Sequence, residues 1–385
     1  MRKHNFITIA AAGLFCLSLA GCSSAPVNNS SASNAETESA KVAVDQDIVA
    51  KSKKMVEDSL SAKEGFTPES TGPIAQNPGA QVVFIGADLT NGGINSVAKG
   101  VQEAADVIGW RTQILDGKAS AQGRTEALSQ AIALKPKGII LGGFDAKEQA
   151  TLIKEAADAG IPVVSWHAGP MPGPMDEYSV FTNVTTDADA VAEMSAAFVV
   201  ADSDGKAGVA LLTDRQYDIA VSKSDKMKEY IEKCEGCEIL AYENAPIAEA
   251  DARMPSLVAS WLQQYGDKLT YIVGVNGNYF GGAQTALRSA GIAGDGYPKG
   301  VAAGDGDAAE FQRIRNHDYQ SATIAEPVNL QGWQLVDELN RAMAGVGPSS
   351  FVASPGLVTA DNIGEGEAFD PPSGYRDVYK KVWGK

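Results

Sequence analysis

The chain has 385 residues and a formal net charge of −16 at pH 7, because 48 Asp and Glu outnumber 32 Lys and Arg. A chain this acidic repels phosphate backbones and anionic lipid headgroups, which excludes nucleic-acid binding and electrostatic adsorption to membranes as functions. The sequence contains none of the motifs GxxxxGKS, GxxxxGKT and GxGxxG, so it lacks the usual phosphate-binding loops of nucleotide-handling enzymes.

The first residues have the pattern of an export signal that ends at a cysteine. Arg2 and Lys3 precede an apolar run that is short for a transmembrane helix, and the small residues LAG come directly before Cys22. This pattern resembles a bacterial lipobox, which implies that residues 1–21 are removed and that Cys22 carries the lipid. The alternative is an ordinary signal peptide followed by a chance cysteine. We therefore expect an exported protein that is lipid-anchored to the cell membrane and faces the periplasm or the cell exterior.

Residues 22–79 are expected to form a lipid-anchored tether that contains one short helix. Asn, Ser, Ala and Thr dominate residues 23–40, which have nothing to bury, whereas residues 44–60 have helical spacing. Prolines and glycines then interrupt residues 67–79, so we expect the folded body to begin near Ala80.

From Gln81 onward, short β-branched runs alternate with amphipathic stretches of helical length. Strands are expected at 81–87, 111–116, 137–143 and 161–166, with helices at 93–109, 125–135 and 147–160. The pattern then begins again, with strands at 206–214, 237–243, 269–276, 300–306 and 319–326 and helices at 224–234, 254–266, 280–291 and 308–317. Strands that are apolar throughout indicate parallel sheets covered on both faces. The sequence therefore predicts an α/β protein with two Rossmann-like lobes.

Two cysteines remain once the leader and the lipid site are set aside. Cys234 and Cys237 lie in KCEGCEIL, where a helix is expected to end and a strand to begin. In an exported protein this spacing favours a disulfide, with free thiols as the alternative. A zinc site is disfavoured because no second Cys or His pair accompanies the two cysteines, and a thioredoxin-like pair would normally open a helix rather than close it.

Polar and aromatic side chains follow the expected strands, where open α/β sheets bind their ligands. The polar candidates are Asn91, Asp145, Asn276, Asp305 and Glu326, and the aromatic candidates are Phe144, Trp166 and Tyr279. This mixture suits a sugar or polyol, whose hydroxyls need fixed polar partners and whose C–H face needs a flat ring. Five of these residues also have a structural alternative: Asp305 and Asn91 at helix starts, Asn276 as a turn residue, and Trp166 and Phe144 as core.

Catalysis is the less favoured interpretation. His167 is the one histidine near the expected cleft, and metal sites or Ser/Cys-His catalysis usually need more. A carboxylate pair for glycoside hydrolysis could be chosen from Asp145, Asp305 and Glu326, but any acidic cleft offers such pairs. We expect a binding protein that is not an enzyme and has no metal and no cofactor.

The strand ends resemble those of the type I periplasmic solute-binding proteins, in the ribose- and galactose-binding branch that serves sugar ABC importers. The resemblance rests on VVFIGADLTNGGINSVAKG, PVVSWHAG, YIVGVNGNYFGGAQTALRSAG and AAGDGD, and on ATIAE where the family has ATIAQ. It implies a three-segment hinge with crossings near Asn183, Glu326 and Ser354. Lobe 1 would then comprise residues 80–183 and 327–354, and lobe 2 residues 184–326 and 355–385.

Residue by residue, the resemblance places ligand contacts on Asn91, Ile94, His167, Lys223, Asn276, Asp305 and Glu326. The chain also departs from the family. His167-Ala168 replaces an Asp-Arg pair, Lys223 replaces an arginine, and aromatic positions fall on Gly93, Ile94 and Ile247. Ribose is therefore not carried over as the ligand, and the stacking surface would come from Trp166, Phe144, Tyr217 or Tyr279.

With no matching arginine, a neutral pentose, hexose or polyol is expected first, and an amino sugar or other cation second. The resemblance implies a monomer that captures this ligand between its lobes and delivers it to the permease subunits of an ABC importer. A sensor that presents a sugar or a signalling furanone to a receptor would look the same. A repressor of the same fold would need an N-terminal helix-turn-helix and a basic face, which this chain lacks.

Overall fold

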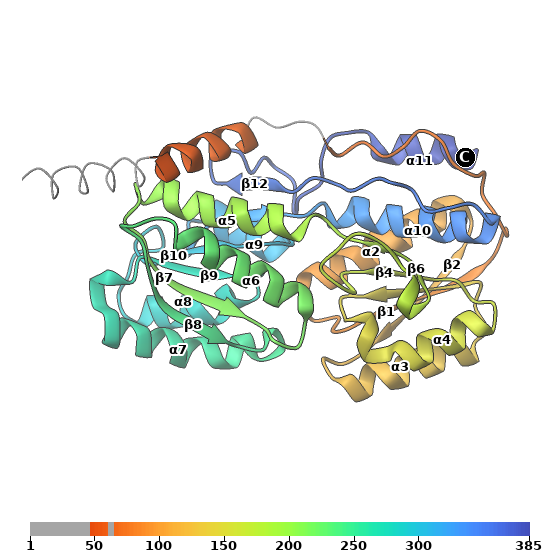
Figure 1. Cartoon of the computed structure of the whole chain (residues 1–385), viewed down its shortest axis with the longest axis horizontal. Helices are drawn as coiled ribbons and strands as arrows, with labels where there is room; N and C mark the ends of the chain where they lie inside the picture. Colours follow the sequence, from red (N-terminus) through yellow and green to blue (C-terminus); the bar gives the residue numbers. More distant parts are fainter. Residues whose placement is uncertain (1–46, 61–64) are drawn as a thin grey trace, which may run out of the picture. The chain divides into compact units, whose positions relative to one another are not determined.

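Two six-stranded sheets organise the computed structural model, which describes residues 47–60 and 65–385 (Figure 1). The described residues belong to one compact unit. We call the first sheet with its helices lobe 1 and the second sheet with its helices lobe 2. The predicted α/β fold with two lobes is confirmed.

The sheet of lobe 1 has the strand order β2-β1-β3-β4-β6-β5, and every pairing is parallel except that of β5 with β6. Its strands are β1 (Gln81–Gly86), β2 (Arg111–Asp116), β3 (Gly138–Gly142), β4 (Val163–Trp166), β5 (Gly173–Met175) and β6 (Val180–Val184). Its helices are α2 (Gly92–Ile108), α3 (Ala121–Ala133), η1 (Ala146–Gln149), α4 (Ala150–Asp158), η2 (Asp176–Tyr178) and α10 (Val328–Ala344). All five residues of β3 are buried, as a strand covered on both faces requires.

The sheet of lobe 2 has the order β12-β11-β10-β9-β7-β8, with β12 antiparallel to β11. Its strands are β7 (Gly208–Thr213), β8 (Glu238–Asn244), β9 (Tyr271–Gly274), β10 (Lys299–Ala302), β11 (Gln320–Ala325) and β12 (Gly356–Thr359). Its helices are α5 (Ala188–Asp202), α6 (Asp218–Ile231), η3 (Ile247–Glu249), α7 (Ala250–Tyr265), η4 (Gly266–Lys268), α8 (Tyr279–Ser289) and α9 (Ala308–Arg315). The chain passes from lobe 1 to lobe 2 after β6 and returns to lobe 1 after β11, where it forms α10. It then crosses to lobe 2 again to form β12.

Residues 181–187, where the sequence predicted neither a strand nor a helix, contain most of β6. Val180 and Val184 are buried, and the Asn183 side chain accepts hydrogen bonds from Ser165 Oγ and Ala168 N, each at 3.0 Å. The Asn183 side chain is therefore satisfied inside the lobe. Helix α6 also begins at Asp218, six residues before the predicted start at 224.

The structure differs from the expected tether over residues 65–79, which we call the strap. The strap lies against lobe 1: Asn340 Oδ1 accepts from Gln76 N at 2.8 Å, Trp110 Nε1 donates to Gln76 O at 2.8 Å, and Phe66 is buried. Prolines and glycines rule out a regular element, but side chains of α10 satisfy the strap's backbone. The folded body therefore begins well before Ala80.

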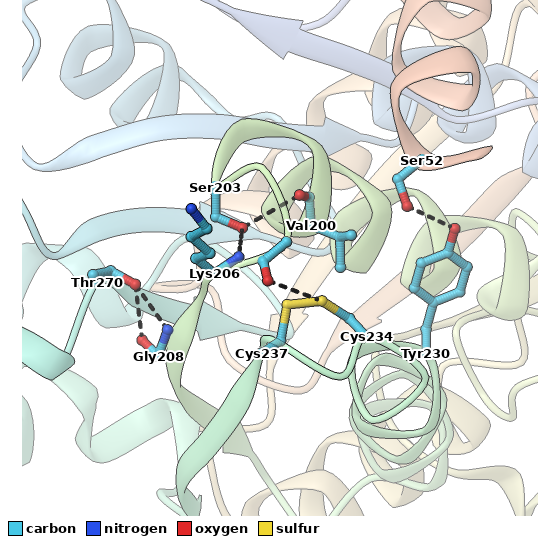
Figure 2. The surroundings of a disulfide bond; sticks show 10 residues. Ser52, Val200, Ser203, Lys206, Gly208, Tyr230, Cys234, Cys237 and Thr270 are labelled. Atoms are coloured by element: carbon cyan, nitrogen blue, oxygen red, sulfur yellow. Dashed lines mark hydrogen bonds between the residues drawn. A yellow bond between two sulfur atoms is a disulfide. The ribbon is translucent and has the colours of Figure 1, made fainter. Parts of the chain in front are cut away.

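The helix of residues 47–60 also lies against the folded body, because Ser52 Oγ is 3.0 Å from Tyr230 Oη of α6 (Figure 2). Figure 2 also shows the disulfide that joins Cys234 and Cys237, between the end of α6 and the start of β8. Of the two states left open by the sequence, the structure has the bonded one. Within the described ranges, no helix combines the length and the apolar character that a bilayer crossing requires.

The last helix, α11 (Tyr375–Trp383), lies on lobe 1, although residues 355–385 were assigned to lobe 2. Strand β12 does join the second sheet, but the Trp383 ring stacks on Trp333 of α10 with ring centroids 5.6 Å apart. Trp383 Nε1 also donates to Asp337 Oδ1 at 2.7 Å. Aromatic stacking on α10 therefore returns the end of the chain to lobe 1.

Replacing the buried indole with Trp383→Ala is expected to lower the free energy of unfolding by about 3–5 kcal/mol, because the variant loses the stack and leaves Asp337 Oδ1 without its donor. Urea denaturation measures this change. Leu134→Ala, at an exposed position of lobe 1, is the control and should cost less than about 0.5 kcal/mol. If Trp383→Ala lowered the free energy of unfolding as little as Leu134→Ala does, the assignment of α11 to the core of lobe 1 would be contradicted.

Candidate functional site

A cavity lies between the two lobes at the carboxyl ends of their strands, and it brings together seven of the residues predicted from the sequence. These are Asn91, Ile94, Trp166, His167, Lys223, Asn276 and Asp305. The remaining lining residues are Asp88, Gly143, Tyr217, Ile219, Ala220, Ile247, Ala248 and Val275. Tyr217 was already a candidate for the stacking surface, and Ile247 was named as a position where the family has an aromatic residue. Ile219 and Ala220 were missed because they belong to the first turn of α6, which starts earlier than its hydrophobic pattern indicates.

The first wall of the cavity is the N-terminus of α2, which Asn91 caps. Asn91 Oδ1 accepts from Gly93 N at 3.0 Å and from Ile94 N at 3.2 Å. The side chain therefore stabilises the helix end, and its amide NH₂ makes no hydrogen bond to the described residues. Both the structural and the ligand interpretation of Asn91 remain compatible with this geometry.

Glycines at the start of α2 allow carboxylates of lobe 2 to approach it closely. A Cβ atom at Gly92 would lie 1.7 Å from Asp307 Oδ2, and one at Gly93 would lie 2.4 Å from Asp305 Cγ. The unpaired N–H groups and the dipole at a helix N-terminus favour negative charge. The pair of glycines in TNGG therefore serves the contact between the lobes.

A buried ionic cluster lies next to the cavity. Glu326, which is fully buried, accepts from Lys223 Nζ through Oε1, and its Oε2 is 2.7 Å from His167 Nε2. Burial opposes ionisation of Glu326, but Lys223 and His167 outweigh it and hold the pKa of this carboxyl below its usual range. Burial lowers the pKa of His167 despite the nearby carboxylate, so His167 donates from Nε2 as a neutral ring at pH 7. The charges of Lys223 and Glu326 therefore cancel.

Asp305 supplies the buried carboxylate of the cavity wall, which also includes the half-buried Asp88. Burial raises the pKa of Asp305 to about 7, repulsion by Glu326 adds to the rise, and Lys223 opposes it. Its side chain makes no hydrogen bond to another described residue, and its backbone adopts the left-handed region with φ 70°. Asp307, rather than Asp305, caps α9 by accepting from Glu310 N at 2.9 Å. The alternative role of Asp305 as a helix cap is therefore wrong.

Flat rings line part of the cavity. The Trp166 and His167 rings stack with centroids 3.7 Å apart, and Trp166 Nε1 donates to Gln331 Oε1 at 2.9 Å. His167 has φ 53°, a left-handed backbone conformation that turns the chain directly after β4. Tyr217 adds a second aromatic residue from lobe 2.

The other four predicted contacts do not line the cavity. Phe144 is fully buried beneath the Arg124 guanidinium, whose carbon lies 5.9 Å from the ring centroid. Tyr279 is buried, and its hydroxyl donates to Ala245 O at 2.8 Å, so it packs rather than stacks on a ligand. Glu326 is enclosed by Lys223 and His167, and Asp145 accepts a backbone hydrogen bond from Asp218.

Among residues 47–60 and 65–385, no group of three or more His, Cys, Asp or Glu side chains is arranged to hold a metal ion. The cavity instead combines hydrogen-bonding side chains, aromatic rings and a few aliphatic groups. Such a lining suits a small polar organic molecule.

Two α/β lobes with a shared cavity at their strand ends are the architecture of solute-binding proteins, and comparisons with known proteins agree. The sequence profile of the periplasmic binding protein domain matches residues 82–346, well over half of the chain. The chain therefore belongs to the periplasmic binding protein domain family, and its identification as a type I member is confirmed. Among curated proteins, none matches the chain in sequence.

Several solved structures share the fold. An ABC transporter solute-binding protein from Agrobacterium vitis, bound with α-D-tagatopyranose, has 18% sequence identity to this chain and a TM-score of 0.66. The match covers 75% of this chain and 97% of the A. vitis chain. The arabinose-binding component from Shewanella sp. ANA-3, bound to L-arabinofuranose, is 18% identical with a TM-score of 0.63, covering 78% and 95%. A protein from Bacillus halodurans with bound myo-inositol is 17% identical with a TM-score of 0.63, covering 77% and 98%.

The raised pKa of Asp305 predicts a pH-dependent stability. Because its pKa is about 7 in the folded chain and 3.8 in an ordinary aspartate, the folded state binds the extra proton between these values. The free energy of unfolding contributed by this group therefore falls as the pH rises through this window. Asp305→Asn removes the titration and should be more stable than the parent protein above pH 7, by at most roughly 4 kcal/mol, with the gain fading toward pH 4.

Urea denaturation of ligand-free protein between pH 4 and pH 8 measures this difference. Asp267→Asn, which neutralises an exposed carboxylate of the same lobe, is the control and should show no such trend. An Asp305→Asn curve parallel to that of the parent protein would contradict the buried, proton-binding state of Asp305.

Proposed function

We propose that the chain is the extracytoplasmic substrate-binding lipoprotein of an ABC importer and that it captures a neutral monosaccharide or polyol between its lobes. The observation that carries the proposal is the cavity lined by both lobes, where Asn91, Asn276 and Asp305 accompany the Trp166 and His167 rings. The hydroxyl groups of a sugar need polar side chains as hydrogen-bond partners, and the C–H face of its ring needs a flat aromatic surface. The residues that line the cavity include no nucleophile in contact with a base, so the site suits binding of a ligand rather than its chemical conversion.

The charge of the cavity favours a neutral ligand. Lys223 is the cation of the lining, and Glu326 already neutralises it. A phosphate or carboxylate group would therefore meet no free positive charge, and it would face Asp305. The carboxylates of Asp88 and Asp305 keep an amino sugar or other cation as the second candidate. Neutral hydroxyls avoid the cost that an anion would meet, and the solved structures with tagatopyranose, arabinofuranose and myo-inositol hold ligands of this class.

Contacts from both lobes connect binding to closure. Asn91, Trp166 and His167 come from lobe 1, whereas Lys223, Asn276 and Asp305 come from lobe 2. A ligand that contacts both lobes stabilises their closed arrangement by its differential affinity for it. The closed protein would dock on the permease, and hinge closure of this kind is a general behaviour of periplasmic binding proteins.

The ligand class is tested by a thermal-shift screen of the mature chain against pentoses, hexoses, polyols, amino sugars, nucleosides and polyamines. We expect a shift with one neutral sugar or polyol. Asn276→Ala should then weaken binding about 5- to 150-fold, since a buried hydroxyl left without its partner costs about 1–3 kcal/mol. Isothermal titration calorimetry measures the change.

Asn278→Ala is the matched control, because Asn278 is two residues away and outside the cavity lining. It should leave the affinity within about twofold. A shift only with polyamines, amino sugars or nucleosides would contradict the neutral-ligand proposal, and release of a chemically altered sugar would contradict a binding function.

Membrane attachment is proposed from the sequence, because residues 1–21 and Cys22 lie outside the described part of the chain. Two acyl chains on Cys22 would hold the protein at the membrane, at about 0.8 kcal/mol per buried CH₂ group. Cys22→Ser in the full-length chain is therefore expected to move the protein from the membrane fraction to the soluble exported fraction, as followed by fractionation and immunoblotting. Retention of the variant in the membrane fraction would contradict lipid attachment at this residue.

A further inference from the structure

Helix α6 carries Ile219, Ala220 and Lys223 of the cavity wall, yet it begins without a capping side chain of its own. Its N-cap residue is Tyr217, whose side chain makes no capping hydrogen bond. The first N–H groups of a helix have no partner within the helix and need an acceptor from elsewhere. Tyrosine cannot supply it as Ser, Thr, Asp or Asn would.

The missing acceptor comes from the other lobe. Asp218 N donates to Asp145, at 3.1 Å from Oδ2 and 3.3 Å from Oδ1. Asp145 stands at the N-cap position of η1 in lobe 1, where an aspartate would ordinarily cap its own helix, but it makes no such bond. Its side chain is 4% exposed. The carboxylate therefore serves α6 rather than the helix that follows it in the sequence.

Neighbouring contacts join the same two segments. Lys147 Nζ is 3.6 Å from Asp145 Oδ2 and forms an ion pair with Asp218. The Arg124 guanidinium of lobe 1 lies 6.0 Å from the Tyr217 ring centroid. The Lys147 and Asp218 side chains are about half exposed, so their ion pair contributes little. Among these contacts between the lobes, the hydrogen bond from Asp218 N to the buried Asp145 is the one that satisfies an N–H group at the start of α6.

We propose that Asp145 is a positioning residue that caps α6 across the cleft and so orders the first turn of α6, and with it the cavity wall, when the lobes meet. Separation of the lobes would withdraw the cap and leave the amides of this turn unpaired. The inference rests on the proposed function only in taking the cavity as the ligand site. Asp145 itself does not line the cavity.

The test compares Asp145→Ala, which has no acceptor, with Asp145→Asn, which keeps one side-chain oxygen for Asp218 N. Hydrogen exchange of the backbone amides of residues 218–221 is measured by NMR in the ligand-free full mature chain. Asp145→Ala should speed exchange at Asp218 by about 2- to 30-fold, the range produced by loss of a helix N-cap. Asp145→Asn should restore at least part of the protection.

Asp158→Ala is the matched control, because it removes an exposed carboxylate from α4 of the same lobe, where Asp158 pairs with Lys154. Urea denaturation of each variant separates a local effect from a global loss of stability. Exchange at Asp218 that is unchanged in Asp145→Ala, or equally fast in Asp145→Ala and Asp145→Asn, would overturn the proposal. No sugar is added, so this outcome is independent of whether the protein binds one.

Discussion

The fully buried carboxylate of Glu326 is the constraint on which the arrangement of the lobes depends. It lies where the chain passes from β11 to α10, and it needs Lys223 of lobe 2 and His167 of lobe 1 at the same time. Removing Lys223 would leave a buried charge uncompensated, and removing His167 would leave Glu326 Oε2 without its donor, so either loss is unfavourable. The two lobes therefore meet over a fixed ionic cluster at their crossing, and the turn after β4 that carries His167 is held in its left-handed conformation.

This cluster also decides what kind of molecule the cavity suits. Because the opposite charges of Lys223 and Glu326 neutralise each other, the cavity offers hydrogen-bonding groups and aromatic faces rather than net positive charge. In the ribose-binding branch the corresponding positions are expected to carry an arginine and a glutamine. This chain has Lys223 and Glu326 there; they bond to each other, and of the two only Lys223 lines the cavity. The shared fold therefore does not by itself identify the ligand.

The sequence predicted most of the strands, because fully buried parallel strands must be apolar along their whole length, and it located much of the cavity, because residues such as Asn91 and Asp305 directly follow strands. What it missed depends on contacts distant in the chain. The start of α6 carries no capping signal because its cap, Asp145, belongs to the other lobe. Composition likewise showed that the strap forms no regular element, but it could not show that Asn340 binds its backbone.

The strap and the C-terminal segment that ends in α11 lie outside residues 82–346, which match the family, and they are hydrogen-bonded to each other. Ala75 N donates to Trp383 O at 3.1 Å, and Ser373 Oγ donates to Phe66 O at 2.7 Å. Each extension thus completes the hydrogen bonding of the other at opposite ends of the sequence. Loss of one extension alone would leave the hydrogen-bonding groups of the other extension without their partners. Among homologues, the two extensions should therefore be inherited as a pair, and a descendant that lacks one should lack both.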